Sequence, residues 1–435
     1  MSSPTLDMSS PVRTALLISV YFPPEPGGGA TSAWNRATIL HKIGYTVFVL
    51  CGFPSYPSGR VYESRYKGKL FYVEQKENFT LIRLRLLPLK SKGYLRRFIL
   101  FINFVFLSLV WMPRIMRIST RTELVYAMAP VLFSSFIGFV YSKVTKSFFI
   151  YEVSDLWPEE LVAFKTHLFF VLVYIGRIFA KMSYSLPDMI VATSELAAEF
   201  VTHNYKPKVV VYTLPIGVEP SKYPFKSKRS SRKELIEKKI LPSSLEDKFI
   251  VLYAGIISKV TRVENLVYAA DKLNQNENDI AFLIIGEGDE KEKLERIKLK
   301  NNIKNLFLVP FQASTFVPSI ISAADVCVVS LPSDPIYEVT VSTKFFDYLA
   351  CFKPQIGICG GELARIINSN NIGLTVRDGE IDKIADSILF LKNSPLLIST
   401  MEENSHAVLQ FFSLDTLASK LDDLLKMEIA RKKDA

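Results

Sequence analysis

Residues 249–273 read FIVLYAGIISKVTRVENLVYAADKL and contain the pattern that decides the fold. A short, almost wholly apolar run is followed by a glycine, a polar turn and a stretch with the apolar periodicity of a helix. Apolar runs of this length are typical of strands that are buried on both faces of a parallel sheet. The segment therefore predicts a strand, a loop and a covering helix in that order.

The same unit recurs on both sides of this segment, which predicts an α/β fold built on parallel sheets. We expect two doubly wound, Rossmann-like domains. The predicted strands of the first series are 15–21, 46–51, 80–87, 124–127, 148–152, 189–193 and 209–213, and those of the second are 249–253, 281–285, 306–309, 326–329, 355–358 and 373–376.

The charged stretch 221–247 interrupts the alternation and marks the region where one domain ends and the next begins. We predict an N-terminal acceptor- and membrane-facing domain over 1–215 and a C-terminal nucleotide-sugar-binding domain over 216–405. A helical tail over 406–435 is expected to pack back on the first domain. Two such domains place the carboxyl ends of their strands toward a central cleft, where ligands of this architecture bind.

Composition excludes several classes of protein. The chain has 435 residues and a net charge of +10, with 49% hydrophobic and 22% charged residues, which excludes disordered and fibrous chains. The scattered histidines and four cysteines lack metal-ligand or disulfide-framework spacing, so we expect reduced thiols and no metal. The Ser/Pro-rich start predicts no signal peptide, and the run 98–113 is shorter than a membrane span, so we expect a cytoplasmic protein.

A basic and aromatic segment suggests contact with a membrane surface. No acidic residue occurs between Glu77 and Glu123, and basic clusters flank an apolar run. This arrangement is typical of a helix that lies in the interface of an anionic membrane, although a buried core helix with solvated flanks would look similar. Nucleic acid is not an expected partner, because no recognised motif is present. The predicted membrane contacts are Arg96, Arg97, Phe98, Phe101, Phe104, Arg114 and Arg117.

Two loops of the first domain could contact ligands. Gly28 and Gly29 follow the first predicted strand and precede a helix, where glycine lets a ligand approach backbone N–H groups. Asp155, in VSDLWPEE, follows another strand and could orient a hydroxyl or transfer a proton. A loop without a ligand and a helix cap are the alternatives for these two positions.

The second domain offers groups for a diphosphate and a ribose. Gly255 permits close approach of the backbone, and Lys259 and Arg262 supply cations before a helix; surface cations on a turn are the alternative. A helix that starts near Ser342 would direct its amides toward a phosphate, and Asp347, about one turn further on, could reach ribose hydroxyls.

Together these segments resemble the family 4 glycosyltransferases of GT-B fold, in particular their WbuB-like branch in bacterial surface polysaccharide synthesis. The resemblance covers nearly the whole chain. It rests on YFPPEPGGGATSAWNRA, YEVSDLWPEEL, LPIGVEP, VLYAGIISKVTRVENL and VSTKFFDYLACFKP, in this order.

The resemblance implies a retaining transfer of a sugar, an N-acetylated hexosamine derivative for example, from a nucleoside diphosphate donor, most often a UDP-sugar. The acceptor would be a lipid-linked saccharide of O-antigen or capsule synthesis, presented at the inner face of the plasma membrane. No metal or other cofactor is implied. Asp155 and Glu338 would act in catalysis, Asp347 would bind ribose, and Gly28, Gly29, Gly255, Lys259, Arg262, Thr343 and Lys344 would bind the donor diphosphate.

Departures from the family pattern leave two other functions open. Ile256 stands where many members have Arg, and Phe352 where they have Gly. These changes motivate a second hypothesis, a catalytically inactive GT-B-like scaffold subunit of a membrane glycosyltransferase complex. A third, an epimerase that acts on a free nucleotide sugar, would not need the basic aromatic segment.

Overall fold

The computed structural model describes residues 13–55, 59–89, 94–129, 133–159, 167–274 and 277–434, with backbone alone at 94, 95, 97 and 167–172. The chain divides into two compact units. The first comprises the chain up to Thr193 together with residues 197–215 and 417–435, and the second comprises Ser194–Leu196 and Ile216–Thr416. Each unit is an α/β domain with its own sheet, as the sequence predicts.

The first unit is built on an eight-stranded sheet of order β3-β4-β2-β1-β5-β6-β7-β8. All neighbouring strands pair in parallel except β3 and β4, which are antiparallel. The strands are β1 (Arg13–Ile18), β2 (Tyr45–Gly52), β3 (Phe71–Lys76), β4 (Phe79–Leu84), β5 (Thr122–Met128), β6 (Phe148–Val153), β7 (Met189–Ala192) and β8 (Val211–Thr213).

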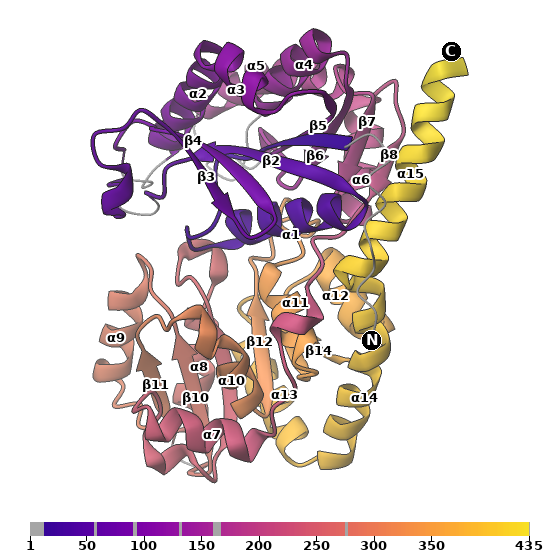
Figure 1. Cartoon of the computed structure of the whole chain (residues 1–435). Coiled ribbons are helices and arrows are strands. Elements are labelled where there is room, and N and C mark those ends of the chain that lie inside the picture. The colour runs from indigo at the N-terminus through magenta and orange to yellow at the C-terminus, as the bar shows by residue number, and fades with distance from the viewer. Residues whose placement is uncertain are drawn as a thin grey trace, which may run out of the picture. The chain divides into compact units, whose positions relative to one another are not determined.

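Helices cover both faces of this sheet. In Figure 1, α1 (Gly28–Lys42) lies below the sheet, and α2 (Tyr94–Val110), α3 (Met112–Ile118), α4 (Ser134–Thr145) and α5 (His167–Ser185) lie above it. The central strands are therefore buried on both sides, which is why they are continuous apolar runs. The remaining helical elements are α6 (Glu195–Tyr205), α15 (Leu414–Asp434) and the short 3-10 helix η1 (Ser64–Tyr66).

A buried charge cluster joins α1 to the sheet of the first unit. The Arg36 and Glu152 side chains are fully buried and form an ion pair, and the Tyr126 hydroxyl donates to the same carboxylate at 2.5 Å. The Arg36 guanidinium also donates to the carbonyls of Leu214 (2.6 Å) and Pro215 (2.9 Å). One arginine therefore fixes the last residues of the first unit before the chain enters the second.

The second unit has a six-stranded, wholly parallel sheet of order β11-β10-β9-β12-β13-β14. Two apolar clusters fill its faces, one around Leu235, Phe345 and Leu363 and the other around Leu266 and Ile384. The strands are β9 (Phe249–Ala254), β10 (Ile280–Ile285), β11 (Leu306–Val309), β12 (Val326–Ser330), β13 (Gln355–Ile358) and β14 (Gly373–Val376).

Helices cover both clusters. The first lies under α7 (Lys228–Glu237), α10 (Val317–Ala323), α11 (Thr343–Ala350), α12 (Gly361–Ser369) and the end of α14 (Pro395–Phe412). The second lies under α8 (Glu264–Leu273), α9 (Lys291–Lys300), α13 (Ile381–Lys392) and the start of α14. Short 3-10 helices are η3 (Pro220–Lys222), η4 (Ser243–Leu245), η5 (Lys259–Thr261) and η6 (Ser314–Phe316).

The C-terminal residues return to the first unit. The division between the units falls between Pro215 and Ile216 and again between Thr416 and Leu417. The predicted start of the tail at residue 406 lies inside α14, so the tail that belongs to the first unit is shorter than predicted. Within the first unit, Tyr212 donates to Glu428 at 2.7 Å, and Lys432 pairs with Asp188 at 2.6 Å.

In the part of the chain that the structure describes, no single helix is both long and apolar enough to cross a bilayer. One pair of helices, Phe98–Val110 and Met112–Ile118, meets that test jointly but is bent by 66°.

Candidate active site

The loop after β9 packs closely against the loop after β10. Gly255 has φ of 147°, and its N–H donates to the carbonyl of Ile285 at 2.9 Å. A Cβ on Gly286 would lie 1.8 Å from the Gly255 carbonyl oxygen. The two backbones can run this close together only because residue 286 lacks a side chain.

The side chain of Lys344, at the start of α11, packs against the loop after β9 at Gly255. A Cβ on Gly255 would lie 2.1 Å from Cε of Lys344. The Nζ of Lys344 lies 5.3 Å from the centre of the Tyr253 ring. Thr343 is the first residue of α11, and Lys259 is exposed in η5. The second unit therefore brings the loop after β9 into contact with the start of α11, almost 90 residues further along the sequence.

Asp347 lies in α11 in a partly buried position. The Tyr223 hydroxyl donates to its Oδ1 at 2.6 Å. Burial raises the pKa of the Asp347 carboxyl to about 6, although the Tyr223 hydrogen bond and the Lys344 cation act in the opposite direction. Asp347 is thus a carboxylate whose charge depends on pH near neutrality.

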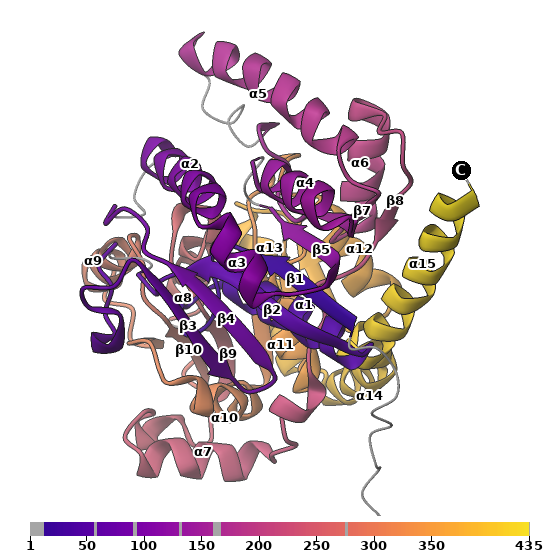
Figure 2. The same cartoon turned by 45° about the horizontal axis from the view of Figure 1, so that its top comes forward.

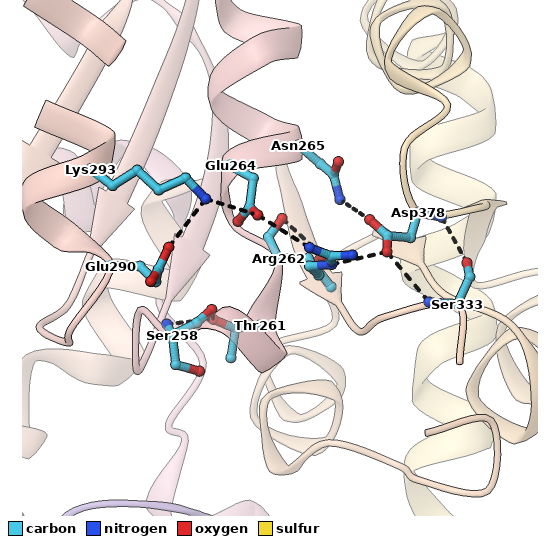
Figure 3. A network of polar contacts seen from close by, with 10 residues as sticks. Ser258, Thr261, Arg262, Glu264, Asn265, Glu290, Lys293, Ser333 and Asp378 are labelled. Carbon is cyan, nitrogen blue, oxygen red and sulfur yellow. Dashed lines mark hydrogen bonds and ion pairs between the residues drawn. The ribbon is translucent and has the colours of Figure 1, made fainter. Parts of the chain in front are cut away.

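Arg262 belongs to a polar network drawn in Figure 3. The residue has φ of 45°, and its Nε lies 3.1 Å from Oδ2 of Asp378. A second carboxylate, Glu264, lies 3.6 Å from its Nη1. Asp378 also accepts a hydrogen bond of 2.7 Å from the buried side chain of Asn265. The charge of Arg262 is therefore balanced by protein carboxylates.

Lys293 extends the same network. Its Nζ lies 3.3 Å from Glu264 and 3.1 Å from Glu290 (Figure 3). Three carboxylates and two cations thus meet here, so an anionic ligand at Arg262 would compete with Asp378. Lys259 and Lys344 are the predicted diphosphate cations that lie outside this network.

Glu338 is paired with a residue that the sequence did not suggest. Arg377 Nη1 lies 2.6 Å from Oε1 of Glu338. Arg377 and Asp378 directly follow β14, and each binds one of the predicted donor residues. Their place after a strand, at the carboxyl edge of a parallel sheet, is the signal that could have found them.

The predicted residues of the first unit also follow strands. Gly28 and Gly29 are exposed at the start of α1, and a Cβ on Gly29 would lie 3.7 Å from the ring of Tyr21, an ordinary van der Waals distance. Asp155 is partly exposed beyond β6, and its carbonyl accepts the N–H of Trp157 at 3.1 Å. Packing in the first unit therefore does not require a glycine at 29.

The predicted membrane contacts are wrong for two aromatic residues. Phe101 and Phe104 are 8% and 0% exposed, because this side of α2 packs into the core of the first unit. Phe98 is partly exposed, while Arg96, Arg114 and Arg117 are exposed. The side chain of Arg97 lies outside the described residues. Among the described residues, no group of three or more His, Cys, Asp or Glu side chains could hold a metal ion.

Two Rossmann-like units define the class of this protein as GT-B. Residues 236–408 match the family model "Glycosyl transferases group 1". The chain therefore contains a group 1 glycosyltransferase domain, which confirms the predicted family at this level. The WbuB-like branch stays a prediction.

Curated relatives agree with this family. The chain is 27% identical to the alpha-D-kanosaminyltransferase of Streptomyces kanamyceticus over 162 residues, which are 37% of this chain and 41% of that protein. It is 30% identical to the putative colanic acid biosynthesis glycosyl transferase WcaI of Escherichia coli over 80 residues, 18% of this chain and 19% of WcaI. The matches span less than two thirds of these relatives.

Solved structures confirm the fold. Sucrose-phosphate synthase from Thermosynechococcus elongatus has a TM-score of 0.74 at 17% identity, covering 96% of this chain and 100% of that chain. Anabaena HepE in complex with UDP has a TM-score of 0.65 at 15% identity, with 95% and 100% covered. WaaG, a glycosyltransferase involved in lipopolysaccharide biosynthesis, has a TM-score of 0.65 at 15% identity, with 94% and 99% covered.

Proposed function

We propose that this protein is a retaining glycosyltransferase that takes a sugar from a nucleoside diphosphate donor, with UDP-sugars the first candidates. The observation that carries the proposal is the convergence of Gly255, Lys344 and Asp347 within the group 1 domain. HepE, whose fold is similar, is known in complex with UDP and with UDP-glucose, which supports this donor class.

Lys344 and Lys259 would stabilise the diphosphate as it leaves. Cations fixed at the point where negative charge develops lower the barrier without reorganisation of solvent. Such cations take the part that a metal ion plays in other transferases, so we propose that the reaction needs neither metal nor other cofactor. Glu338 would contact the donor sugar, in a position set by its ion pair with Arg377.

The acceptor is proposed to be a lipid-linked saccharide of O-antigen or capsule synthesis at the inner face of the plasma membrane. Two similar proteins, WcaI and WaaG, are named for colanic acid and lipopolysaccharide biosynthesis, which supports a surface polysaccharide. Asp155, at the carboxyl edge of the first unit's sheet, would face the acceptor hydroxyl.

The test is release of nucleoside diphosphate from a panel of nucleotide sugars, with a membrane lipid extract as the acceptor and a chelator present. One donor should be consumed only when the extract is added, and Lys344→Ala should abolish that consumption. Consumption that requires an added divalent metal would contradict the metal-free part of the proposal, and the absence of turnover with every donor would contradict the whole.

A scaffold without catalysis is the second candidate. The observation that favours it is Arg262, whose charge is balanced by Asp378 and Glu264. Phe352, where the family pattern has Gly, takes a left-handed conformation with φ of 57° and stacks on His406 with ring centres 3.5 Å apart. A scaffold would bind membranes or a partner without any affinity for nucleoside diphosphates.

A further inference from the structure

The outer sides of α2 and α5 expose a large set of apolar side chains. On each helix the exposed residues recur at helical spacing, so they form one stripe on the side away from the core. Phe106 and Tyr174, for example, are 62% and 69% exposed. The set is Ile99, Ile102, Phe106, Leu109 and Val110 on α2, and Tyr174, Ile175, Ile178, Phe179 and Met182 on α5.

These stripes belong to one continuous surface of the first unit. Both helices contact α4, on the same side of the sheet (Figures 1 and 2). The ring of Phe133, just before α4, lies 5.8 Å from Phe98 of α2 and 5.8 Å from Phe179 of α5. An exposed apolar surface of this extent is uncommon on a monomer in water and marks an interaction site.

The charged side chains on α2, α3 and α5 are all basic. Residues 94–118, which cover α2 and α3, contain no acidic residue, and neither do residues 167–185 of α5, in a chain with 43 acidic side chains. Arg114 and Arg117 are exposed at one end of the α2 stripe, and Arg177 and Lys181 lie along α5. Arg177 pairs with Glu159 at 3.0 Å, and the Glu159 side chain is itself buried.

The inner side of α5 rests on the loop that carries Asp155. A Cβ on Gly176 would lie 2.6 Å from Cβ of Pro158, so the helix and the loop are in close contact. Glu159, the next residue, binds both Arg177 and the hydroxyl of Tyr205. The outer side of α5 therefore carries the exposed apolar residues, and its inner side contacts the loop that contains Asp155, the predicted acceptor residue.

We propose that α2 and α5 together form a docking surface for an anionic lipid bilayer. The apolar stripes enter the boundary between headgroups and acyl chains, and the flanking cations meet the headgroups. The inference deepens the proposed function and rests on it in one respect: docking through α5 places the Asp155 loop next to the bilayer that holds a lipid-linked acceptor. The basic segment between Glu77 and Glu123 contains α2 but not α5, so the sequence alone does not indicate that α5 contributes to the docking surface.

Sedimentation of the full chain with vesicles tests the proposal. The vesicles are phosphatidylcholine alone and phosphatidylcholine with phosphatidylglycerol, at low and high salt. We expect binding to the anionic vesicles that weakens with salt. Ile178→Glu with Met182→Glu on α5, and Ile102→Glu with Phe106→Glu on α2, should each lower the partition coefficient by about tenfold or more, since each loses two apolar contacts.

The matched control is Leu299→Glu with Leu396→Glu in the second unit. These leucines are 79% and 84% exposed, and the pair of substitutions adds the same charge. It should leave the partition coefficient within about twofold, because neither residue belongs to the docking surface. Arg114→Gln with Arg117→Gln removes two cations and should lower binding to anionic vesicles by about thirtyfold.

Several results would overturn the proposal. Wild-type protein that ignores anionic vesicles, or binds neutral ones equally well, contradicts the docking surface or its charge. Unchanged binding of the α5 variant removes α5 from the surface. Self-association that the α5 variant abolishes, without vesicle binding, assigns the surface to a second copy. Vesicle binding needs no nucleotide, so intact binding without sugar transfer would instead refute the proposed function and leave the surface standing.

Discussion

The proposed donor site of the second unit combines single residues from segments that the sequence alone does not connect. Lys344 occupies the space above Gly255 that any side chain at that position would fill. Arg262, which the sequence places beside Lys259, is directed to Asp378 instead. Substitutions of Lys259, Lys344 and Asp347 should therefore test the proposed donor site most directly.

Asp347→Asn should weaken binding of the nucleoside diphosphate in a pH-dependent way. The pKa of about 6 means that wild-type Asp347 carries a full charge for ribose hydroxyls only above that pH. The ratio of wild-type to variant affinity should rise through pH 6 and level off at about tenfold or more, since hydrogen bonds to charged groups contribute about 1.5–3 kcal/mol. Titration calorimetry at several pH values measures this ratio, and a ratio of one throughout would refute the ribose assignment.

The same substitution should raise stability at neutral pH. Between pH 3.8 and about 6, the Asp347 carboxyl holds a proton in the native state, because its pKa is raised there, whereas the same carboxyl in the unfolded chain has lost its proton. The free energy of unfolding therefore falls as pH rises through that window, and Asp347→Asn removes this loss. Urea denaturation at pH 4 and pH 7 should show a gain confined to pH 7; an equal effect at both values would contradict the raised pKa.

Lys344→Ala should lower affinity for the nucleoside diphosphate by about tenfold or more, because a charge-assisted contact with the diphosphate is lost. Lys383→Ala is the control, since Lys383 is exposed on α13 and pairs with Glu380. Equal affinities of the two variants for UDP, GDP, ADP or CDP, whichever binds, would show that Lys344 is not a diphosphate ligand.

Elements of secondary structure follow closely from the pattern of the sequence where they are buried. Strands β9 to β14 lie where continuous apolar runs predict them, because both faces of each strand are covered by helices. Strand β3 was not predicted. It lies at the edge of its sheet and is partly accessible to water along its length, so its sequence, FYVEQK, lacks a continuous apolar run.

The site could be predicted only in part. Positions after strands could be read from the chain, since parallel strands end at one edge of the sheet. The sequence does not show which face of a helix is buried. Phe101, Phe104 and Phe106 all lie on α2, but only the first two are buried, because that side of the helix packs on the core of the first unit. Arg377 and Asp378 also follow a strand, but their partners, Glu338 and Arg262, lie far away in the sequence, so the sequence does not indicate these pairs.

The buried pair of α1 and β6 should control the stability of the first unit. Glu152→Gln leaves the Arg36 guanidinium buried without its counter-charge, which should cost about 3–5 kcal/mol of unfolding free energy. Glu123→Gln, which breaks the exposed contact with Arg13 at 3.9 Å, should cost less than about 1 kcal/mol. Urea denaturation compares the two, and similar losses would contradict a dominant role for the buried pair.

The two units of the whole chain carry different parts of the proposed function. The second unit carries the group 1 domain and the proposed donor groups. The first carries Asp155 and the α2–α5 surface, and its last helix, α15, returns to it from the far end of the chain. A ligand that binds the donor site should therefore protect the second unit's loops first.

Hydrogen exchange of the full chain, with and without saturating UDP, GDP, ADP or CDP, tests the central claim most directly, because a ligand that binds the native state suppresses local opening around its site. We predict that one of these nucleoside diphosphates slows exchange at residues 255–262 and 343–347, and that Lys344→Ala reduces this protection. Exchange that no nucleoside diphosphate slows at these residues would contradict a donor site in the second unit.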